Sequence, residues 1–125
     1  MNFPVDPVTG LVDRPAPRPY PFGPSSLATL LDAPLAATPD KLALIDGDRE
    51  WTYRELDAEI ERTAAALLAI GAGAGSRVAW TLPNCAELPI GLLATQRIGA
   101  LWLGINAPLA PPEKAYMLAD AEVSL

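Results

Sequence analysis

The stretch "WTYREL", residues 51–56, contains the junction that decides the fold. Its first three residues are aromatic or β-branched and favour a strand, whereas its last three favour a helix. Thr52 and Glu55 have the T-x-x-E spacing of a capping box, in which the threonine oxygen accepts the N–H of Glu55 and the glutamate side chain reaches back. The sequence therefore predicts that a strand ends at Thr52 because a helix begins there.

An apolar stripe follows the junction, with spacings of three and four residues that are typical of one buried helix face. Its members are Leu56, Ile60, Ala64, Leu67 and Leu68. Gly71 comes shortly after the stripe and can adopt the left-handed conformation that commonly ends a helix. The pattern predicts a helix that begins after Thr52 and ends at Gly71.

Two further elements precede the junction. Residues 42–51 alternate around the turn Asp46-Gly47-Asp48, which predicts a short hairpin-like pair of strands. A short serine-capped helix with three leucines, Leu27, Leu30 and Leu31, is expected before the hairpin.

We expect residues 1–23 to form an N-terminal arm. The run "VDRPAPRPYPFGP" is rich in proline, which lacks the N–H that helices and sheets use. Such an arm lies extended over a surface or is disordered, and a proline-rich ligand for another domain is the alternative. Residues 24–125 are then expected to form a partial α/β subdomain.

Strand and helix patterns alternate through the second half of the chain. The apolar runs "SRVAWTL" (76–82) and "ALWLGI" (100–105) predict buried strands, and "AEVSL" (121–125) is typical of the first half of another. Helical segments lie between them, and the later one begins at Pro111-Pro112 and continues through Leu118. This order predicts an α/β fold with right-handed crossovers and a mostly parallel sheet.

The sequence allows two starting points for the helix between the strands at 76–82 and 100–105. Asn84 and Glu87 repeat the spacing of a cap, which indicates a helix from Pro83-Asn84 to about Ile98. The ring of Pro89 would then meet the carbonyl of Cys85, so the helix either begins nearer Glu87 or is kinked.

The composition excludes several classes of function. The 125 residues are half apolar and carry a net charge of −6, with nine Lys and Arg, so nucleic acid is not expected as a partner. The chain has no histidine and one cysteine, which excludes an internal disulfide, a Ser-His or Cys-His pair and an imidazole metal ligand. No signal-peptide pattern and no apolar run of about 18 residues occur, so we expect a cytoplasmic protein without a membrane span.

Two short segments are candidate anion sites. "GAGAG" (71–75) follows a helix and precedes a strand, which is the reverse of the order in a phosphate loop, so we interpret it as a helix end and connection. "TLPNCAE" (81–87) does have the strand–turn–helix order. An anion at its helix start is an alternative, but we expect Asn84 to occupy those N–H groups itself.

The cysteine and the tryptophans are expected to have packing roles. Cys85 lies beside a helix start, where a thiolate would be stabilised, but no histidine is present to activate it. Trp51, Trp80 and Trp102 each fall in a predicted strand, so they are expected in the core or an interface rather than in a platform for bases.

Four motifs in order resemble the start of the adenylate-forming (AMP-binding) ligases, which include acyl-CoA synthetases, peptide synthetase adenylation domains and luciferases. "WTYREL" resembles the family's Leu-Thr-Tyr-x-Glu-Leu, and "RIGALWLGIN" resembles its second motif of Gly-Ala, hydrophobic residues and Asn. "TLPNCAE" is similar to Leu-Pro-Asn-x-x-Glu, and "NAPLAPPEKAYML" to Asn-x-x-Leu-x-x-x-Glu-x-x-Tyr-x-Leu. Four motifs over roughly 100 residues are far more specific than any one alone.

The chain departs from the family pattern at two minor positions. Ser76 stands where the family often has Asp, and Ala110 precedes the helix at Pro111 where the family usually has Thr. The second change removes a helix cap, which is expected to cost about 1 kcal/mol.

The resemblance, which is greatest to acyl-CoA synthetases, implies an intact ligase that uses ATP, Mg²⁺ and CoA. Such a ligase, typical of fatty acid metabolism, forms an acyl-adenylate and pyrophosphate from a carboxylic acid and then a thioester. The family's phosphate loop, its adenine- and ribose-contacting motifs and its catalytic lysine lie further along its sequence and have no counterpart here. Lys41 and Lys114 lie at predicted element starts without that lysine's motif. We therefore assign no catalytic, cofactor-binding or metal-binding residue.

We expect these residues to be the N-terminal fragment of such a ligase, truncated or split, and inactive alone. Its partner would be the remainder of the ligase or a second copy, because a strand cut short and an apolar patch invite association. The alternatives are a stand-alone small α/β module that binds a nucleotide or acyl group, and an interaction or assembly partner without catalysis.

Thr52→Ala should lower the free energy of unfolding by about 1 kcal/mol, because the helix loses its cap. Gly71→Val should lower it further, since a β-branched residue resists positive φ. Denaturant titrations followed by circular dichroism measure both changes. An unchanged titration for Gly71→Val would show that the helix ends elsewhere.

Overall fold

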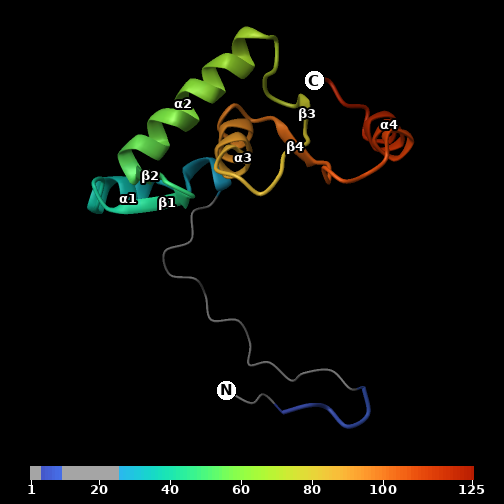
Figure 1. Cartoon of the computed structure of the whole chain (residues 1–125), viewed down its shortest axis with the longest axis horizontal. Helices are drawn as coiled ribbons and strands as arrows, with labels where there is room; N and C mark the ends of the chain where they lie inside the picture. The colour runs from blue at the N-terminus through green and yellow to red at the C-terminus, as the bar shows by residue number, and fades with distance from the viewer. Residues whose placement is uncertain (1–3, 10–25) are drawn as a thin grey trace.

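The structure, a computed structural model, describes residues 4–9 and 26–125 of the chain (Figure 1). The elements in chain order are a 3-10 helix η1 (Leu27–Thr29), α1 (Asp32–Ala37), β1 (Leu42–Asp46), β2 (Arg49–Thr52), α2 (Tyr53–Ala69), β3 (Arg77–Trp80), α3 (Glu87–Arg97), β4 (Leu101–Gly104) and α4 (Pro111–Asp120). The predicted α/β class is confirmed. The proline-rich run of the expected arm lies outside the described residues.

The four strands form two separate two-stranded sheets. β1 and β2 pair antiparallel as the predicted hairpin, and Gly47 in its turn has a φ of 61°. β3 and β4 pair parallel, in register from Arg77 opposite Leu101 to Trp80 opposite Gly104. Of these four strands, only β3 and β4 pair in parallel. The hairpin forms a separate sheet and packs on the helices.

The last residues extend the parallel sheet on the other side of β3. The N–H of Leu125 donates to the carbonyl of Arg77 at 3.3 Å, and the N–H of Ala79 donates to the carbonyl of Leu125 at 2.9 Å. This is the hydrogen-bond pattern of a parallel pair around Val78. The strand predicted at 121–125 is therefore present only as this short hydrogen-bonded segment.

Helices α3 and α4 lie on opposite sides of the parallel strands (Figure 1). The chain moves from β3 to β4 through α3, and then from β4 back past β3 through α4. Right-handed crossovers in opposite directions place their helices on opposite faces of a sheet. The arrangement is therefore a small three-layer α/β/α unit, beside which the hairpin and α2 pack on the outer side of α3.

The predicted junction at Thr52 is confirmed. The Thr52 hydroxyl accepts the N–H of Glu55 at 3.3 Å, and the Glu55 carboxylate accepts the N–H of Thr52 at 2.9 Å. The buried residues of α2 are Leu56, Ile60, Ala64 and Leu67. Leu68 is 55% exposed, so its assignment to the buried stripe was wrong. Its position, one residue past Leu67, points it about 100° away from the buried face.

Three helices end in the same way. After α2, the N–H of Gly71 donates to Leu68 and that of Ala72 donates to Leu67, which is a Schellman motif. α3 ends identically at Gly99, and α4 ends at Glu122, a non-glycine residue with a φ of 47°. The segment "GAGAG" is thus a helix end and a connection, as predicted.

A close contact between α3 and β3 organises the core. A Cβ placed on Gly91 would lie only 2.8 Å from a ring carbon of Trp80. The Trp80 indole N–H donates to the hydroxyl of Thr95 at 3.1 Å, and that hydroxyl donates to the carbonyl of Gly91 at 2.7 Å. Thr95 is completely buried, and its hydroxyl both accepts and donates a hydrogen bond there.

Helix α4 contributes little to the core. None of its residues is buried. Its first turn retains half of a capping box, since the Glu113 carboxylate accepts the N–H of Ala110 at 2.8 Å. The loss of helix stability that we expected from having Ala110 in place of a threonine cap is therefore partly offset. No helix among the described residues is long and apolar enough to cross a membrane.

Gly91→Ala should destabilise the protein by about 1–3 kcal/mol, the usual cost of overpacking a core. The change would normally stabilise a helix interior by up to about 1 kcal/mol, but here the new methyl group would collide with Trp80. Gly73→Ala is the matched control, because no atom lies within 4 Å of its new Cβ. Thermal melts of both variants test the contact, and an equal or higher melting temperature for Gly91→Ala would contradict it.

Candidate functional site

The carboxyl ends of β3 and β4 border a small pocket. In open α/β sheets this is the edge at which ligands usually bind. The pocket has a volume of about 180 Å³. Its lining residues come from both strands, the loops that follow them and the first turn of α3: Trp80, Leu82, Asn84, Leu88, Trp102, Gly104, Ile105 and Asn106.

The chemistry of this carboxyl-edge pocket is apolar with a few neutral polar groups. Trp80 and Trp102 stack with ring centroids 5.4 Å apart and planes 18° apart. Asn84 and Asn106 supply amide groups, and no lining residue is ionisable. The pocket can offer apolar contact and hydrogen bonds, but no group that transfers a proton or neutralises a phosphate at neutral pH.

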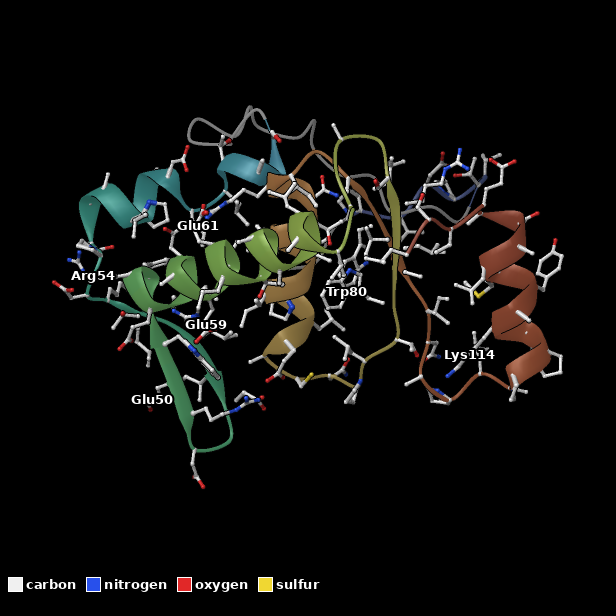
Figure 2. The ribbon with its side chains drawn as sticks, turned by 90° about the horizontal axis from the view of Figure 1, so that it is seen from above. Glu50, Arg54, Glu59, Glu61, Trp80 and Lys114 are labelled. Atoms are coloured by element: carbon white, nitrogen blue, oxygen red, sulfur yellow. The ribbon has the colours of Figure 1, made fainter. Side chains whose placement is uncertain are left out.

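A single lysine lies close to this edge (Figure 2). The ammonium of Lys114 donates to the carbonyl of Ala107 at 2.8 Å and to the hydroxyl of Thr81 at 3.4 Å. It therefore joins the start of α4 to the loops after β3 and β4. No sequence pattern indicates this role, because the acceptors lie on loops that only the fold brings together. Lys41 immediately precedes β1, in the other sheet.

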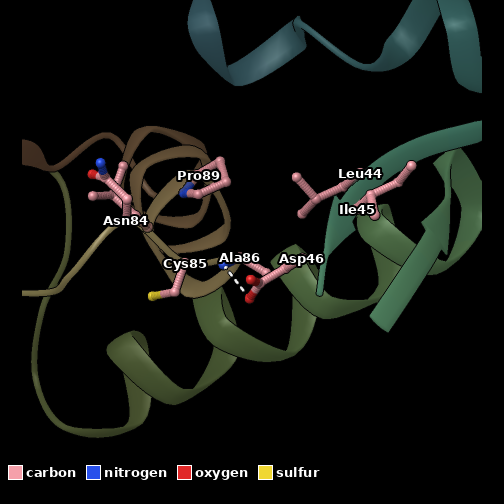
Figure 3. Close-up of a pocket in the computed structure, with 8 residues that line it drawn as sticks. Leu44, Ile45, Asp46, Asn84, Cys85, Ala86 and Pro89 are labelled. Carbon is pink, nitrogen blue, oxygen red and sulfur yellow. Dashed lines mark hydrogen bonds between the residues drawn. The ribbon is translucent and has the colours of Figure 1, made fainter. Parts of the chain in front are cut away.

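A second, larger pocket lies between the hairpin and the start of α3 (Figure 3). Its volume is about 300 Å³, and it is lined by Leu44, Ile45, Asp46, Asn84, Cys85, Ala86, Leu88 and Pro89. The Asp46 carboxylate accepts the N–H of Ala86 at 3.0 Å across this pocket (Figure 3).

Asp46, rather than Asn84, caps α3. The helix begins at Glu87 after Ala86, so Pro89 falls in its first turn, where a missing N–H costs nothing. The later of the two predicted starts is confirmed, and the prediction that Asn84 occupies the free N–H groups is wrong. Pro89 requires the helix to begin near Glu87, and Asn84 then lies too far before the first helical residue to cap it. Sequence analysis missed Asp46 because it is 40 residues away from Ala86.

An arginine links the hairpin to the same helix start. The Arg49 guanidinium contacts the Glu87 carboxylate at 2.6 Å and 3.2 Å and the Asp46 carboxylate at 2.5 Å. It also lies over the Trp51 ring, 5.1 Å from the centroid, in a cation–π contact. Trp51 and Trp80 pack against the core, as the sequence predicted.

These contacts stabilise the charged forms of both acids. Hydrogen bonds from Arg49, then from the Cys85 thiol and the residue's own backbone, lower the pKa of Glu87 to about 2. The Ala86 N–H, followed by Arg49, lowers the pKa of Asp46. The same two acids, Glu87 first, raise the pKa of Arg49. The N-terminus of α3 thus already holds carboxylates, which argues against a further anion there.

The remaining candidates lack chemical partners for catalysis. Cys85 is half-buried, and its thiol donates to the Glu87 carboxylate. Among the described residues no group of three or more acidic or thiol side chains could hold a metal ion. Arg97 contacts Asp57 at 2.8 Å and Glu61 at 2.6 Å and so fastens α3 to α2.

Comparisons with known proteins agree on one family. The family model described as AMP-binding enzyme matches residues 31–125. The isonitrile lipopeptide synthase of Mycobacterium tuberculosis is 39% identical over 111 residues, which cover 89% of this chain and 4% of that protein. The 3-hydroxybenzoate–CoA ligase of an Aromatoleum species is 36% identical over 97 residues, which cover 77% of this chain and 18% of that protein.

Solved structures share the fold. The N-terminal subdomain of Klebsiella oxytoca NpsA superposes with a TM-score of 0.74 at 30% identity, and the match covers 78% of this chain and 26% of that one. The anthranilate CoA ligase AuaEII, crystallised with anthranoyl-AMP, gives a TM-score of 0.72 at 32% identity, over 78% of this chain and 19% of that one. The chain therefore spans a small part of the proteins that it matches.

Glu87→Gln should reduce the acid sensitivity of the fold. A carboxylate whose pKa is lower in the folded state adds stability above its ordinary value of 4.5, and that stability is lost as the pH falls toward about 2. The variant should be less stable at pH 7 and lose less stability than the natural chain between pH 4.5 and 2. Glu50→Gln, an exposed position on β2 outside this cluster, is the control. Equal pH profiles for the natural chain and Glu87→Gln would contradict the assigned ion pair.

Proposed function

The chain belongs to the family of AMP-binding enzymes, and on this premise we propose that it is the N-terminal structural segment of an ATP-dependent acid–thiol ligase. The ligase as a whole would activate a carboxylic acid as an acyl-adenylate with release of pyrophosphate, and then form a thioester with CoA. These residues would build one part of its N-terminal subdomain and supply none of the reacting groups.

The carboxyl-edge pocket is the observation that carries the proposal. The pocket at the edge where an α/β unit would hold a nucleotide is lined by two amides, two tryptophans and apolar side chains, but by no ionisable group. Stabilising a reacting phosphate requires cations or directed N–H groups, usually with a metal ion. Lys114, the cation placed at this edge, has its ammonium bonded to two oxygens of the protein.

The residues that the structure describes do not fit ATP or Mg²⁺. The glycine-rich run at 71–75 is a helix end, and the N-terminus of α3 is occupied by Asp46. No acidic cluster for a metal ion occurs in the part of the chain that the structure describes. ATP, Mg²⁺ and CoA therefore enter the proposal as ligands of the intact ligase, and no step of the reaction is assigned to these residues.

A second candidate function is a stand-alone binding module without catalysis. The carboxyl-edge pocket favours it, since stacked tryptophans and two amides could hold a small, largely apolar molecule. A thermal-shift screen with ATP, CoA and carboxylic acids distinguishes the two, because a structural segment should show no stabilisation.

The low cysteine count and the family premise lead us to propose a cytoplasmic location.

The isolated chain should show no acid-dependent pyrophosphate exchange with ATP, Mg²⁺ and a panel of hydroxybenzoic, anthranilic and fatty acids. Loss of a single electrostatic stabiliser costs about 10²–10³ in rate, and residues 4–9 and 26–125 form no cradle for the phosphates. A chimera in which this chain replaces the matching segment of the Aromatoleum 3-hydroxybenzoate–CoA ligase should restore ligase activity.

The unmodified Aromatoleum ligase and a reaction without protein are the controls for this assay. Exchange by the isolated chain above the protein-free control would refute the proposal that it has only a structural role. A chimera that folds but is inactive would show that the segment is not interchangeable with the family's own.

A further inference from the structure

The carboxyl-edge pocket contains polar groups that the protein itself does not use. Among the described residues, the side-chain amides of Asn84 and Asn106 find no hydrogen-bond partner, and neither does the indole N–H of Trp102. The two asparagines follow β3 and β4, so they lie at the same edge of the sheet. Each amide can therefore offer both a donor and an acceptor to a ligand.

The aromatic wall of the pocket is held in place before any ligand binds. Trp80 lies against Gly91 of α3, and its indole N–H is bonded to Thr95. Trp102 stacks on Trp80, and a Cβ placed on Gly104 would lie 3.0 Å from the indole nitrogen of Trp102. Because the two glycines let both rings lie close to the backbone, the wall needs little reorganisation on binding, which lowers the cost of association.

The volume of the pocket limits the ligand to about one ring. An apolar cavity of about 150 Å³ is enough to bind benzene, and this pocket has a volume of about 180 Å³. The stacked tryptophans favour a flat ring over a saturated one, because aromatic rings attract each other in offset or edge-to-face arrangements. A substituted aromatic ring therefore fits both the space and the wall.

The pocket favours a neutral ligand. None of its lining residues is ionisable, so a charged group would lose its hydration without gaining a partner. The nearby ammonium of Lys114 is already bonded to the carbonyl of Ala107 and to the hydroxyl of Thr81. A carboxylate at this edge would have to displace those bonds to reach the cation.

We propose that the carboxyl-edge pocket is a binding site for a neutral aromatic molecule of about one ring that carries an amide group. The ring would stack on the tryptophan wall, and the amide would exchange hydrogen bonds with Asn84 and Asn106. The inference does not rest on the proposed ligase, because its contacts involve only residues of this chain and no reaction step. Benzamide is the simplest molecule of this class, and with so few atoms in contact we expect millimolar binding.

Titration of the ¹⁵N-labelled chain with benzamide, followed by NMR spectroscopy, is the first test. The indole N–H signal of Trp102 should shift and saturate, because this side chain lines the pocket. The signal of Trp51 should not move, since Trp51 lies in the other sheet. If the Trp102 signal shows no saturable shift up to the solubility limit of benzamide, the proposal is overturned.

Three relatives of benzamide test the class of ligand. At neutral pH, benzoate and benzamidinium have nearly the same shape but carry a negative and a positive charge. Cyclohexanecarboxamide keeps the amide but lacks the flat ring. Each should bind about tenfold more weakly than benzamide, or worse, because a charge loses hydration and a saturated ring loses stacking. Binding of any of the three as tightly as benzamide would refute the proposed class.

Variants of the two asparagines test the polar contacts. Asn84→Ala and Asn106→Ala should each weaken benzamide binding about two- to tenfold, the usual net effect of one hydrogen bond, and leave the binding of toluene unchanged. Both side chains are exposed, so the variants should fold. Gln96→Ala is the matched control, because Gln96 lies near the other end of α3 and outside the pocket. The proposal is wrong if neither asparagine variant reduces the preference for benzamide over toluene, or if Gln96→Ala reduces it equally.

Discussion

The contact between Trp80 and α3 holds the parallel unit together. One indole ring lies against the backbone of Gly91, donates to the buried hydroxyl of Thr95 and stacks on Trp102 of β4. It thereby joins two strands to the helix that connects them. Because β4 and the final segment both pair with β3, the carboxyl-edge pocket depends on the same ring.

The features that were predictable from the sequence are those with local causes. The capping box at Thr52 and Glu55 and the helix end at Gly71 each depend on residues within one or two turns of each other. The alternation of strands and helices likewise follows from short periodic patterns. The error at Leu68 is of the same local kind, since a residue at the border of an apolar stripe can fall on either side of it.

The features that were not predictable depend on contacts between distant segments. Glu122 adopts a left-handed conformation that a glycine would occupy more readily, and nothing in its immediate sequence marks it. Lys114 finds its two oxygen partners only after β3 and β4 have been placed side by side. For the candidate site, the absence of histidine already excluded most chemistry, but the neutral character of the carboxyl-edge pocket could be read only from the fold.

The capping of α3 by Asp46 links secondary structure to tertiary structure. A helix whose first N–H groups are satisfied by its own neighbours can persist as a transient element in an unfolded chain. α3 has only a few such local bonds, among them the one from the N–H of Leu88 to the carbonyl of Cys85, and its start is also stabilised from a hairpin 40 residues away. Hairpin and helix each lose a stabilising contact when the other opens, so they form one cooperative unit, and this coupling makes partly folded states of this half of the molecule scarce.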